Sequence, residues 1–249
     1  MRVWQWTVTA IAIYLIALLV TLPARQVLPH LPLPASVQVQ GVSGTVWQGK
    51  AQQVWIDGLP IHGLEWQISP WHLLIGQARV SLKAGNARDS EEVSLSGPLA
   101  VPLWGEPAIE AESLELYLPT DLVIAKLPLP LPVNAGGRFK VSIDTLQYAG
   151  RCQQLQGKGQ WLNASVAGTR GPIALGNFDA QLMCDDGSVM IGVRPPNEFG
   201  LTADATVSPE LQFSVIGRFK PADNLPEEVH QAAAFFGKTD AEGYYAINF

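Results

Sequence analysis

Residues 138–144 of this chain read RFKVSID, and their pattern predicts the fold class. Phe139, Val141 and Ile143 are apolar, whereas the residues beside them are charged or polar. Side chains of a β-strand point to opposite faces in turn, so the stretch predicts a strand with one buried and one solvated side. The same alternation recurs in six further runs, at residues 64–68, 78–83, 178–182, 201–207, 211–215 and 245–249.

Short clusters of Gly, Asn, Asp and Pro separate these runs, as in DDGS at residues 185–188. Such residues favour tight turns, so we expect an all-β, mostly antiparallel fold of many short strands. Helical signals are confined to residues 120–127 and 224–236. In the second stretch Asn224 is a suitable cap and Gly237 a suitable end, and we expect its apolar side to pack on the sheet through Val229, Ala233 and Phe236.

Composition excludes two classes of protein. The chain has 249 residues, of which 47% are hydrophobic and 15% charged, too apolar for a disordered protein. The net charge is -6, and without Arg2 and Arg25 the remaining 14 basic and 22 acidic residues give 14 − 22 = −8. Nucleic acid is bound mainly by basic side chains that neutralise phosphates, so no nucleic-acid partner is expected.

The amino-terminal segment predicts a membrane anchor. Residues 3–22 carry no charge, and a helix of this length spans about 30 Å, the thickness of the bilayer's hydrocarbon core. A cleaved signal peptide is the competing interpretation, but Leu22 is too large for a cleavage site. We therefore expect a bacterial inner-membrane protein that crosses the membrane once, with a short cytoplasmic start and the bulk of the chain in the periplasm.

Three segments follow from this interpretation. Residues 1–22 form the cytoplasmic start and transmembrane signal-anchor helix, and residues 23–36 form a proline-rich stalk that holds the domain clear of the membrane. Residues 37–249 form a β-rich periplasmic domain. The run LPLPLPV at residues 127–133 is its clearest internal break, so a division into two halves stays open.

No constellation of residues indicates catalysis. The string GTVWQGKA at residues 44–51 has the spacing of a phosphate loop, but Ala51 stands where Ser or Thr should bind magnesium, and a β-hairpin is the better interpretation. The four histidines have no closely spaced partner typical of a metal site. We expect no enzyme activity, no catalytic, cofactor-binding or metal-binding residues, and no cofactor.

Cys152 and Cys184 are the two cysteines of the chain. A small, even number of cysteines is compatible with an oxidising compartment, so we expect them to form a disulfide. Two buried free thiols are the alternative.

Several stretches together resemble a known family, type II secretion system protein N. They are VSGTVWQGKAQQVWIDGLPIHGLEWQISPWHLLIG at residues 42–76, GRFKVSIDTL, GKGQWLNASV, LGNFDAQL, and the closing run from residue 225. The resemblance covers essentially the whole chain. It implies an accessory inner-membrane component, structural or assembling in role, of the machinery that exports folded periplasmic proteins across the outer membrane. It also implies that other secretion subunits and inner-membrane lipid are partners, and leaves a homo-oligomer open.

Residues 58–76 are also similar to modules of AsmA-like envelope proteins. That likeness implies a curved sheet with an apolar groove, and the alternative function is binding or handling lipid in this groove. A secretion scaffold would instead dock other proteins on sheet edges and exposed aromatic residues, for which Trp55, Trp71 and Trp104 are candidates.

Overall fold

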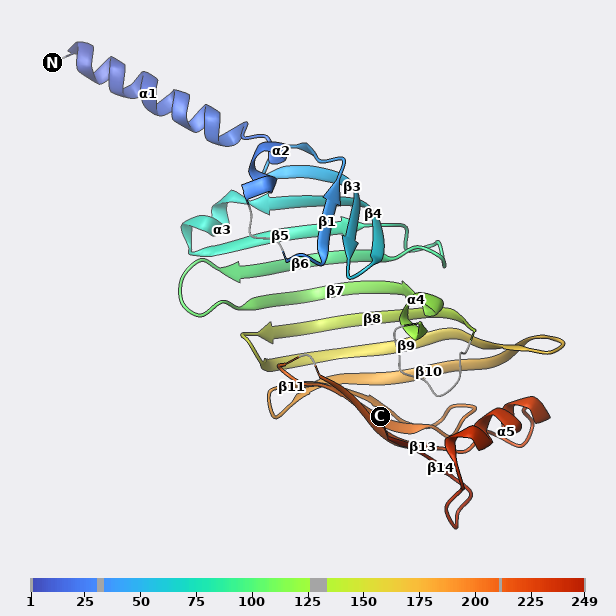
Figure 1. Cartoon of the computed structure of the whole chain (residues 1–249). Helices are drawn as coiled ribbons and strands as arrows, with labels where there is room; N and C mark the ends of the chain where they lie inside the picture. Colours follow the sequence, from blue (N-terminus) through green and yellow to red (C-terminus); the bar gives the residue numbers. More distant parts are fainter. Residues whose placement is uncertain (1, 31–33, 126–133, 211, 249) are drawn as a thin grey trace.

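The computed structural model describes residues 2–30, 34–125, 134–210 and 212–248. The chain begins with a helix, α1 (Arg2–Val20), which projects from the rest of the molecule (Figure 1). A short helix α2 (Ala24–Val27) and a 3-10 turn η1 (Leu28–His30) follow, so the described part of the predicted stalk contains helical turns. Within the part of the chain that the structure describes, no helix combines the length and apolar character expected of a membrane span, so the predicted transmembrane assignment is not supported.

Among the described residues, the main body is one curved antiparallel sheet of 14 strands (Figure 1). Its first half contains β1 (Val37–Gln40), β2 (Ser43–Gly44), β3 (Gln48–Ile56), β4 (Leu59–Ser69), β5 (Gln77–Ala84), β6 (Ser94–Pro102) and β7 (Ile109–Pro119). Its second half contains β8 (Ala135–Tyr148), β9 (Cys152–Gly168), β10 (Gly171–Asp185), β11 (Ser188–Val193), β12 (Thr202–Val207), β13 (Phe213–Phe219) and β14 (Tyr245–Asn248). The predicted all-β, antiparallel and curved fold is confirmed.

The strands are neighbours in chain order from β3 to β14, with β1 beside β3 and β2 paired to β3. Tight turns produce this order. Asp57 and Gly58 between β3 and β4, and Asp186 and Gly187 between β10 and β11, all have positive φ, as two-residue hairpins require. β7 pairs directly with β8, so the sheet continues past the proposed break, whose residues 127–133 lie outside the described residues.

The two faces of the sheet differ in polarity. Directly opposed residues share a face, and one such set of apolar residues runs from β4 to β9: Ile68, Val80, Leu99, Ala111, Leu146 and Leu155. A second set runs from β7 to β13: Leu114, Ile143, Gly157, Leu182, Ile191, Ala205 and Val215. The other face carries a polar set: Lys83, Ser96, Glu115, Ser142, Lys158, Gln181, Gly192 and Asp204. The alternation in the sequence thus becomes one apolar and one polar face.

Bulges keep the apolar face continuous where strict alternation would break it. Ala111 lies opposite Leu99 and Leu116 lies opposite Leu95, although five residues separate Ala111 from Leu116. An odd spacing would place them on opposite faces of a regular strand. Ser113, with φ of 52°, supplies the irregularity that returns Leu116 to the apolar side.

The apolar face is covered at its two ends. At the first end, the far part of the β3–β4 hairpin packs Val54 and Ile61 into a core with Ala84 and Val93. At the second end, helix α5 (Glu227–Ala233) and the segment before it pack Val229 and Leu225 against β9 and β10. Each end therefore has a small core of its own, and the middle of the face is not part of either cluster.

The short helices follow the sequence with adjusted ends. The predicted helix at 224–236 is α5 followed by the 3-10 turn η2 (Ala234–Phe236), and Gly237 ends it with φ of 114°. Val229 and Ala233 are buried and the ring of Phe236 packs on Phe219, as predicted. The N-cap is Pro226 rather than Asn224, and the helix begins at Glu227. The other predicted helix is α4 (Thr120–Ile124), and α3 (Pro70–Leu74) was not predicted.

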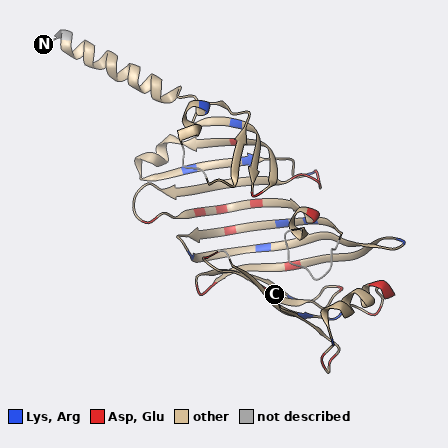
Figure 2. Ribbon diagram, viewed as in Figure 1, with Lys and Arg blue, Asp and Glu red and all other residues tan. Residues whose placement is uncertain are grey.

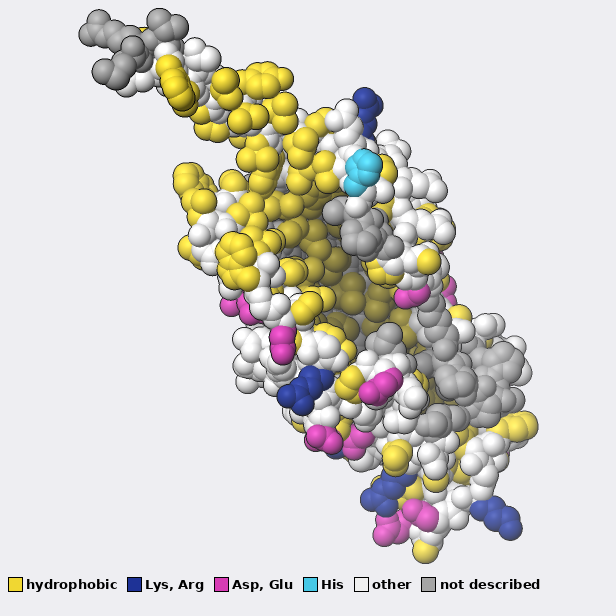
Figure 3. All heavy atoms as spheres, turned by 60° about the vertical axis from the view of Figure 1, so that its left-hand side comes forward, with side chains coloured by type: hydrophobic (Ala, Val, Ile, Leu, Met, Phe, Trp, Pro, Cys, Tyr) yellow, Lys and Arg dark blue, Asp and Glu magenta, His cyan; other side chains and the backbone are white. Residues whose placement is uncertain are grey.

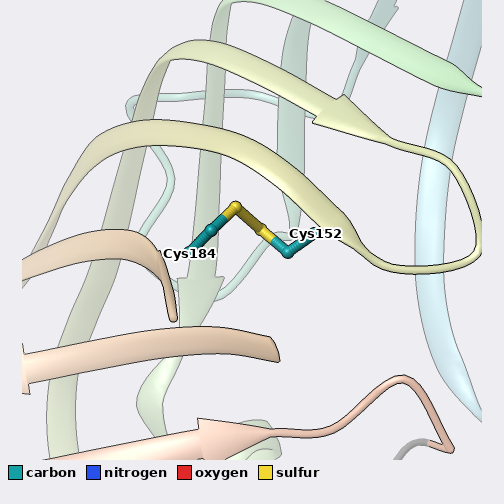
Figure 4. Close-up of a disulfide and its surroundings, with 2 residues drawn as sticks. All are labelled: Cys152 and Cys184. Carbon is teal, nitrogen blue, oxygen red and sulfur yellow. A yellow bond between two sulfur atoms is a disulfide. The ribbon is translucent and has the colours of Figure 1, made fainter. Parts of the chain in front are cut away.

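Cys152 and Cys184 form a disulfide in the structure (Figure 4). It joins the start of β9 to the end of β10, two strands that already pair along most of their length. Their Cα atoms are 5.5 Å apart. The bond therefore fixes one end of the β9–β10 pair.

Candidate interaction surface

A hollow lined by hydrophobic side chains runs from the base of α1 along the molecule (Figure 3). The uncovered middle of the apolar face carries the set from Leu114 to Val215, and every member of this set is partly exposed. Partly exposed aliphatic side chains favour binding of another apolar group. We call this partly exposed part of the apolar face the apolar groove.

Charges lie on the opposite face of the sheet. Arg79 pairs with Glu112 at 3.0 Å and Arg194 pairs with Asp204 at 2.7 Å. Lys140 contacts Tyr117 and Glu115, and the Tyr117 hydroxyl is the main cause that raises the pKa of Lys140, with Glu115 adding to it. The separation of polar and apolar side chains leaves the groove suited to an uncharged ligand or partner surface.

An aromatic ladder, defined as Phe139, Trp161, Phe178, Phe199 and Phe219, supports the second half of the sheet. Neighbouring rings have centroids between 5.4 and 6.0 Å apart. The indole of Trp161 also donates a hydrogen bond to the carbonyl of Gly136 at 3.1 Å. Phe139, Trp161 and Phe178 lie on the successive strands β8, β9 and β10, and packing of rings across neighbouring strands stabilises this half of the sheet.

Helix α1 is attached to the sheet by hydrogen bonds at its carboxyl end. The indole Nε1 of Trp47 donates to the carbonyl of Leu19 at 2.8 Å, and the amide of Val46 donates to the carbonyl of Leu22 at 3.0 Å. Leu19 lies in the last turn of α1 and Leu22 just beyond it, where backbone carbonyls have no i+4 amide partner within the helix. The side chains of α1 from Trp4 to Val20 are exposed, and the body of the helix carries no charge (Figure 2).

The three tryptophans proposed for docking do not lie together. Trp55 is partly buried on β3, whereas Trp71 on α3 and Trp104 after β6 are 76% and 73% exposed. The ring of Trp104 lies over Gly76, at the end of the turn after α3. Trp71 and Trp104 therefore belong to one region and Trp55 to another.

The residues weighed for chemistry lie in structural positions. The string at 44–51 forms the β2–β3 hairpin, in which Ser43 pairs with Lys50 and Gly44 with Gly49. Among the described residues, no group of three or more His, Cys, Asp or Glu side chains is placed to hold a metal ion. The Nδ1 of His72 lies 2.7 Å from the hydroxyl of Ser69 at the start of α3.

Two features of this surface were not found from the sequence. Arg138 is buried on the polar side, donates to the carbonyls of Ala87 and Glu92, and lies 4.6 Å from the ring centre of Tyr117. The indole of Trp47 attaches α1 to the sheet. Both contacts join segments far apart in the chain, and no local pattern marks them.

Comparison with known proteins gives one consistent family. Residues 35–248 match the family model described as "Type II secretion system (T2SS), protein N". A protein of that name from Aeromonas hydrophila is 29% identical over 95% of this chain and 93% of its own length, and one from Vibrio cholerae is 28% identical over 93% and 91%. The protein of that name from Klebsiella pneumoniae is 25% identical. No solved structure matches the chain.

Proposed function

Because the chain belongs to the type II secretion system protein N family, we propose that it is a structural subunit of type II secretion and catalyses no reaction. It acts at the inner membrane of a Gram-negative cell, with α1 as the anchor and the sheet in the periplasm. The other subunits of the secretion machinery are its partners. In that role it supports the export of folded periplasmic proteins across the outer membrane.

The uncovered apolar groove on a rigid sheet carries this proposal. A sheet stiffened by the aromatic ladder and the Cys152–Cys184 bond presents the same surface to each partner. Apolar residues that stay partly exposed between two covered ends are free to bury area against another subunit. A scaffold requires these two properties, a stable shape and an apolar surface that is exposed to partners.

Membrane attachment rests on α1. Residues 3–22 are uncharged, and the large apolar side chains of α1 between Trp4 and Val20 are exposed. Exposed apolar side chains gain free energy when they leave water for lipid. The carboxyl end of α1 is bonded to the sheet, so anchoring α1 also fixes the distance of the sheet from the membrane.

Paired photocrosslinking in cells tests the scaffold proposal. A photoreactive amino acid replaces Leu182, on the apolar face, or Gln181, its neighbour on the polar face. We expect position 182 to crosslink to secretion subunits that position 181 does not reach, and deletion of the gene to abolish secretion with the folded exoproteins retained in the periplasm. Normal secretion in the deletion strain would overturn the proposal.

A second candidate function, lipid handling in the groove, is favoured by the same uncharged set of side chains. Acyl chains need only an apolar, partly open surface. Phospholipid found by native mass spectrometry after gentle extraction, and lost in Leu182→Glu but kept in Gln181→Glu, would support it. Normal secretion in cells that carry Leu182→Glu would then assign the groove to lipid and not to secretion.

A further inference from the structure

Five large apolar side chains are exposed together at one rim of the sheet: Trp71, Leu74, Ile75, Leu103 and Trp104. The first three come from α3 and its end, and the other two from the turn between β6 and β7. Their exposed fractions lie between 46% and 78%. We name this set the tryptophan rim.

The two segments of the tryptophan rim form one surface. The amide of Leu103 donates to the carbonyl of Gly76 at 2.9 Å, which joins the β6–β7 turn to the end of the α3 segment. The indole of Trp104 occupies the space that a side chain at position 76 would need. Gly76 has φ of 83°, a backbone conformation that suits glycine and lets the turn pass beneath the indole.

The tryptophan rim carries no formal charge. Residues 70–78 and 98–105 contain no Asp, Glu, Lys or Arg. Exposed apolar patches of this size are uncommon on proteins surrounded by water and mark contact with protein or lipid. Tryptophan in particular is enriched where membranes meet water, because the ring is apolar and its N–H can stay hydrated.

The position of α1 favours lipid over protein as the partner of the tryptophan rim. Figure 1 shows α3 and the β6–β7 turn on the side of the sheet toward which α1 extends. The hydrogen bonds from Trp47 and Val46 to the end of α1 hold the helix relative to the sheet. When α1 enters a bilayer, the rim is therefore brought toward the surface of the same bilayer.

We propose that the tryptophan rim inserts into the interfacial layer of the phospholipid bilayer that receives α1. This inference rests on the proposed membrane attachment and adds a second point of contact to it. The domain then lies against the membrane in a fixed orientation. A helix alone would leave the sheet free to rotate about the helix axis, whereas two contacts prevent that rotation.

Fluorescence quenching from lipid tests the proposal on the full chain. Single cysteines replace Leu74 in the rim, Leu15 in α1 or Ile216 on β13, and each is labelled with an environment-sensitive fluorophore while the native disulfide stays oxidised. Leu74 and Ile216 are 78% and 67% exposed, so each substitution should leave the fold intact and the two sites are matched. The protein is placed in nanodiscs of phosphatidylethanolamine and phosphatidylglycerol, with or without lipids that carry a quencher on the acyl chain.

We expect quenching at positions 15 and 74 and none at position 216. Quenching at 15 without quenching at 74 would overturn the rim contact and leave the anchor standing. No quenching at 15 would overturn both the anchor and the inference that rests on it. Equal quenching at 74 and 216 would mean unspecific adsorption of the domain and would also reject the rim as the contact.

Discussion

The indole nitrogen of Trp47 lies 2.8 Å from the backbone carbonyl of Leu19, 28 residues earlier in the chain. Trp47 belongs to the turn between β2 and β3, and Leu19 to the last turn of α1. A side chain of the sheet thus takes the place of a helix cap and turns a projecting helix into an oriented one. The proposed membrane contacts depend on this relationship.

The first prediction concerns that bond. Trp47→Phe keeps a ring but removes the donor, so the carbonyl of Leu19 loses the hydrogen bond from the indole at a cost of about 1 kcal/mol. We expect α1 to separate from the sheet more often and trypsin to cleave faster after Arg25, in the connecting segment. Trp55→Phe, on β3, is the control and should be cleaved at the rate of the parent. Equal cleavage of Trp47→Phe and the parent would show that the bond does not hold α1.

The second prediction concerns close packing beneath Trp66. A Cβ at Gly49 would overlap the ring of Trp66 and lie 2.8 Å from the carbonyl oxygen of Ser43. The ring cannot easily move, because its Nε1 donates to the carbonyl of Val46 at 3.0 Å. Gly49→Ala should therefore lower the free energy of unfolding by about 1–3 kcal/mol in denaturant titration.

Gly159→Ala is the matched control for that substitution. Its Cβ would lie 3.4 Å from the Cβ of Ala180, an ordinary contact, on a similar strand of the same sheet. We expect little change in unfolding. A loss of stability as large as that of Gly49→Ala would point to glycine's effect in strands generally and not to the packing of Trp66.

The third prediction concerns the disulfide. Cys152 and Cys184 are 32 residues apart, and a crosslink over such a loop stabilises by about 3–4 kcal/mol, chiefly by restricting the unfolded chain. Cys152→Ala with Cys184→Ala should lower the urea midpoint, and the parent without reductant should titrate no free thiol. Two free thiols in the unfolded, unreduced parent would contradict the bond.

The fourth prediction concerns the loss of the Thr169–Glu228 hydrogen bond at acidic pH. The amide of Thr169 donates to the carboxylate of Glu228 at 2.8 Å and lowers the pKa of Glu228 below its ordinary value of 4.5. A lowered pKa in the folded state means that the contact stabilises above the unfolded pKa and is lost as pH falls through the lowered one. We expect the protection of α5 amides from hydrogen exchange to fall over this acidic range.

Glu228→Gln should lower that protection already at neutral pH and flatten its dependence on pH. Glu227→Gln, one residue away on α5, is the control and should titrate like the parent. A carboxyl resonance of Glu228 that titrates at the ordinary glutamate value would refute the contact.

Much of the fold was predictable because alternation is a local property. The runs at 64–68, 78–83 and 178–182 lie in β4, β5 and β10, and RFKVSID lies in β8. Leu211, which began one predicted run, and Phe249, which ended another, lie outside the described residues. Asn224 failed as a cap because Pro226 two residues later is the N-cap of the helix.

The candidate surfaces were predictable only in part. Trp71 and Trp104 were singled out as exposed aromatics, and both are exposed. Their union into one rim follows from a hydrogen bond between Leu103 and Gly76, 27 residues apart, which no sequence pattern marks. The groove was expected from a resemblance, and its lining emerged only with the strand register.

The sequence by itself determined that this chain forms strands with one apolar and one polar side, because the two-residue period of a strand can be read from neighbouring residues. Only the tertiary structure decided how those sides are used. Pairing between distant residues set the register, and the irregularity at Ser113 kept Ala111 and Leu116 on one face. The two ends of that face are covered and its middle is open, because burial depends on which distant segments fold back and pack on the face.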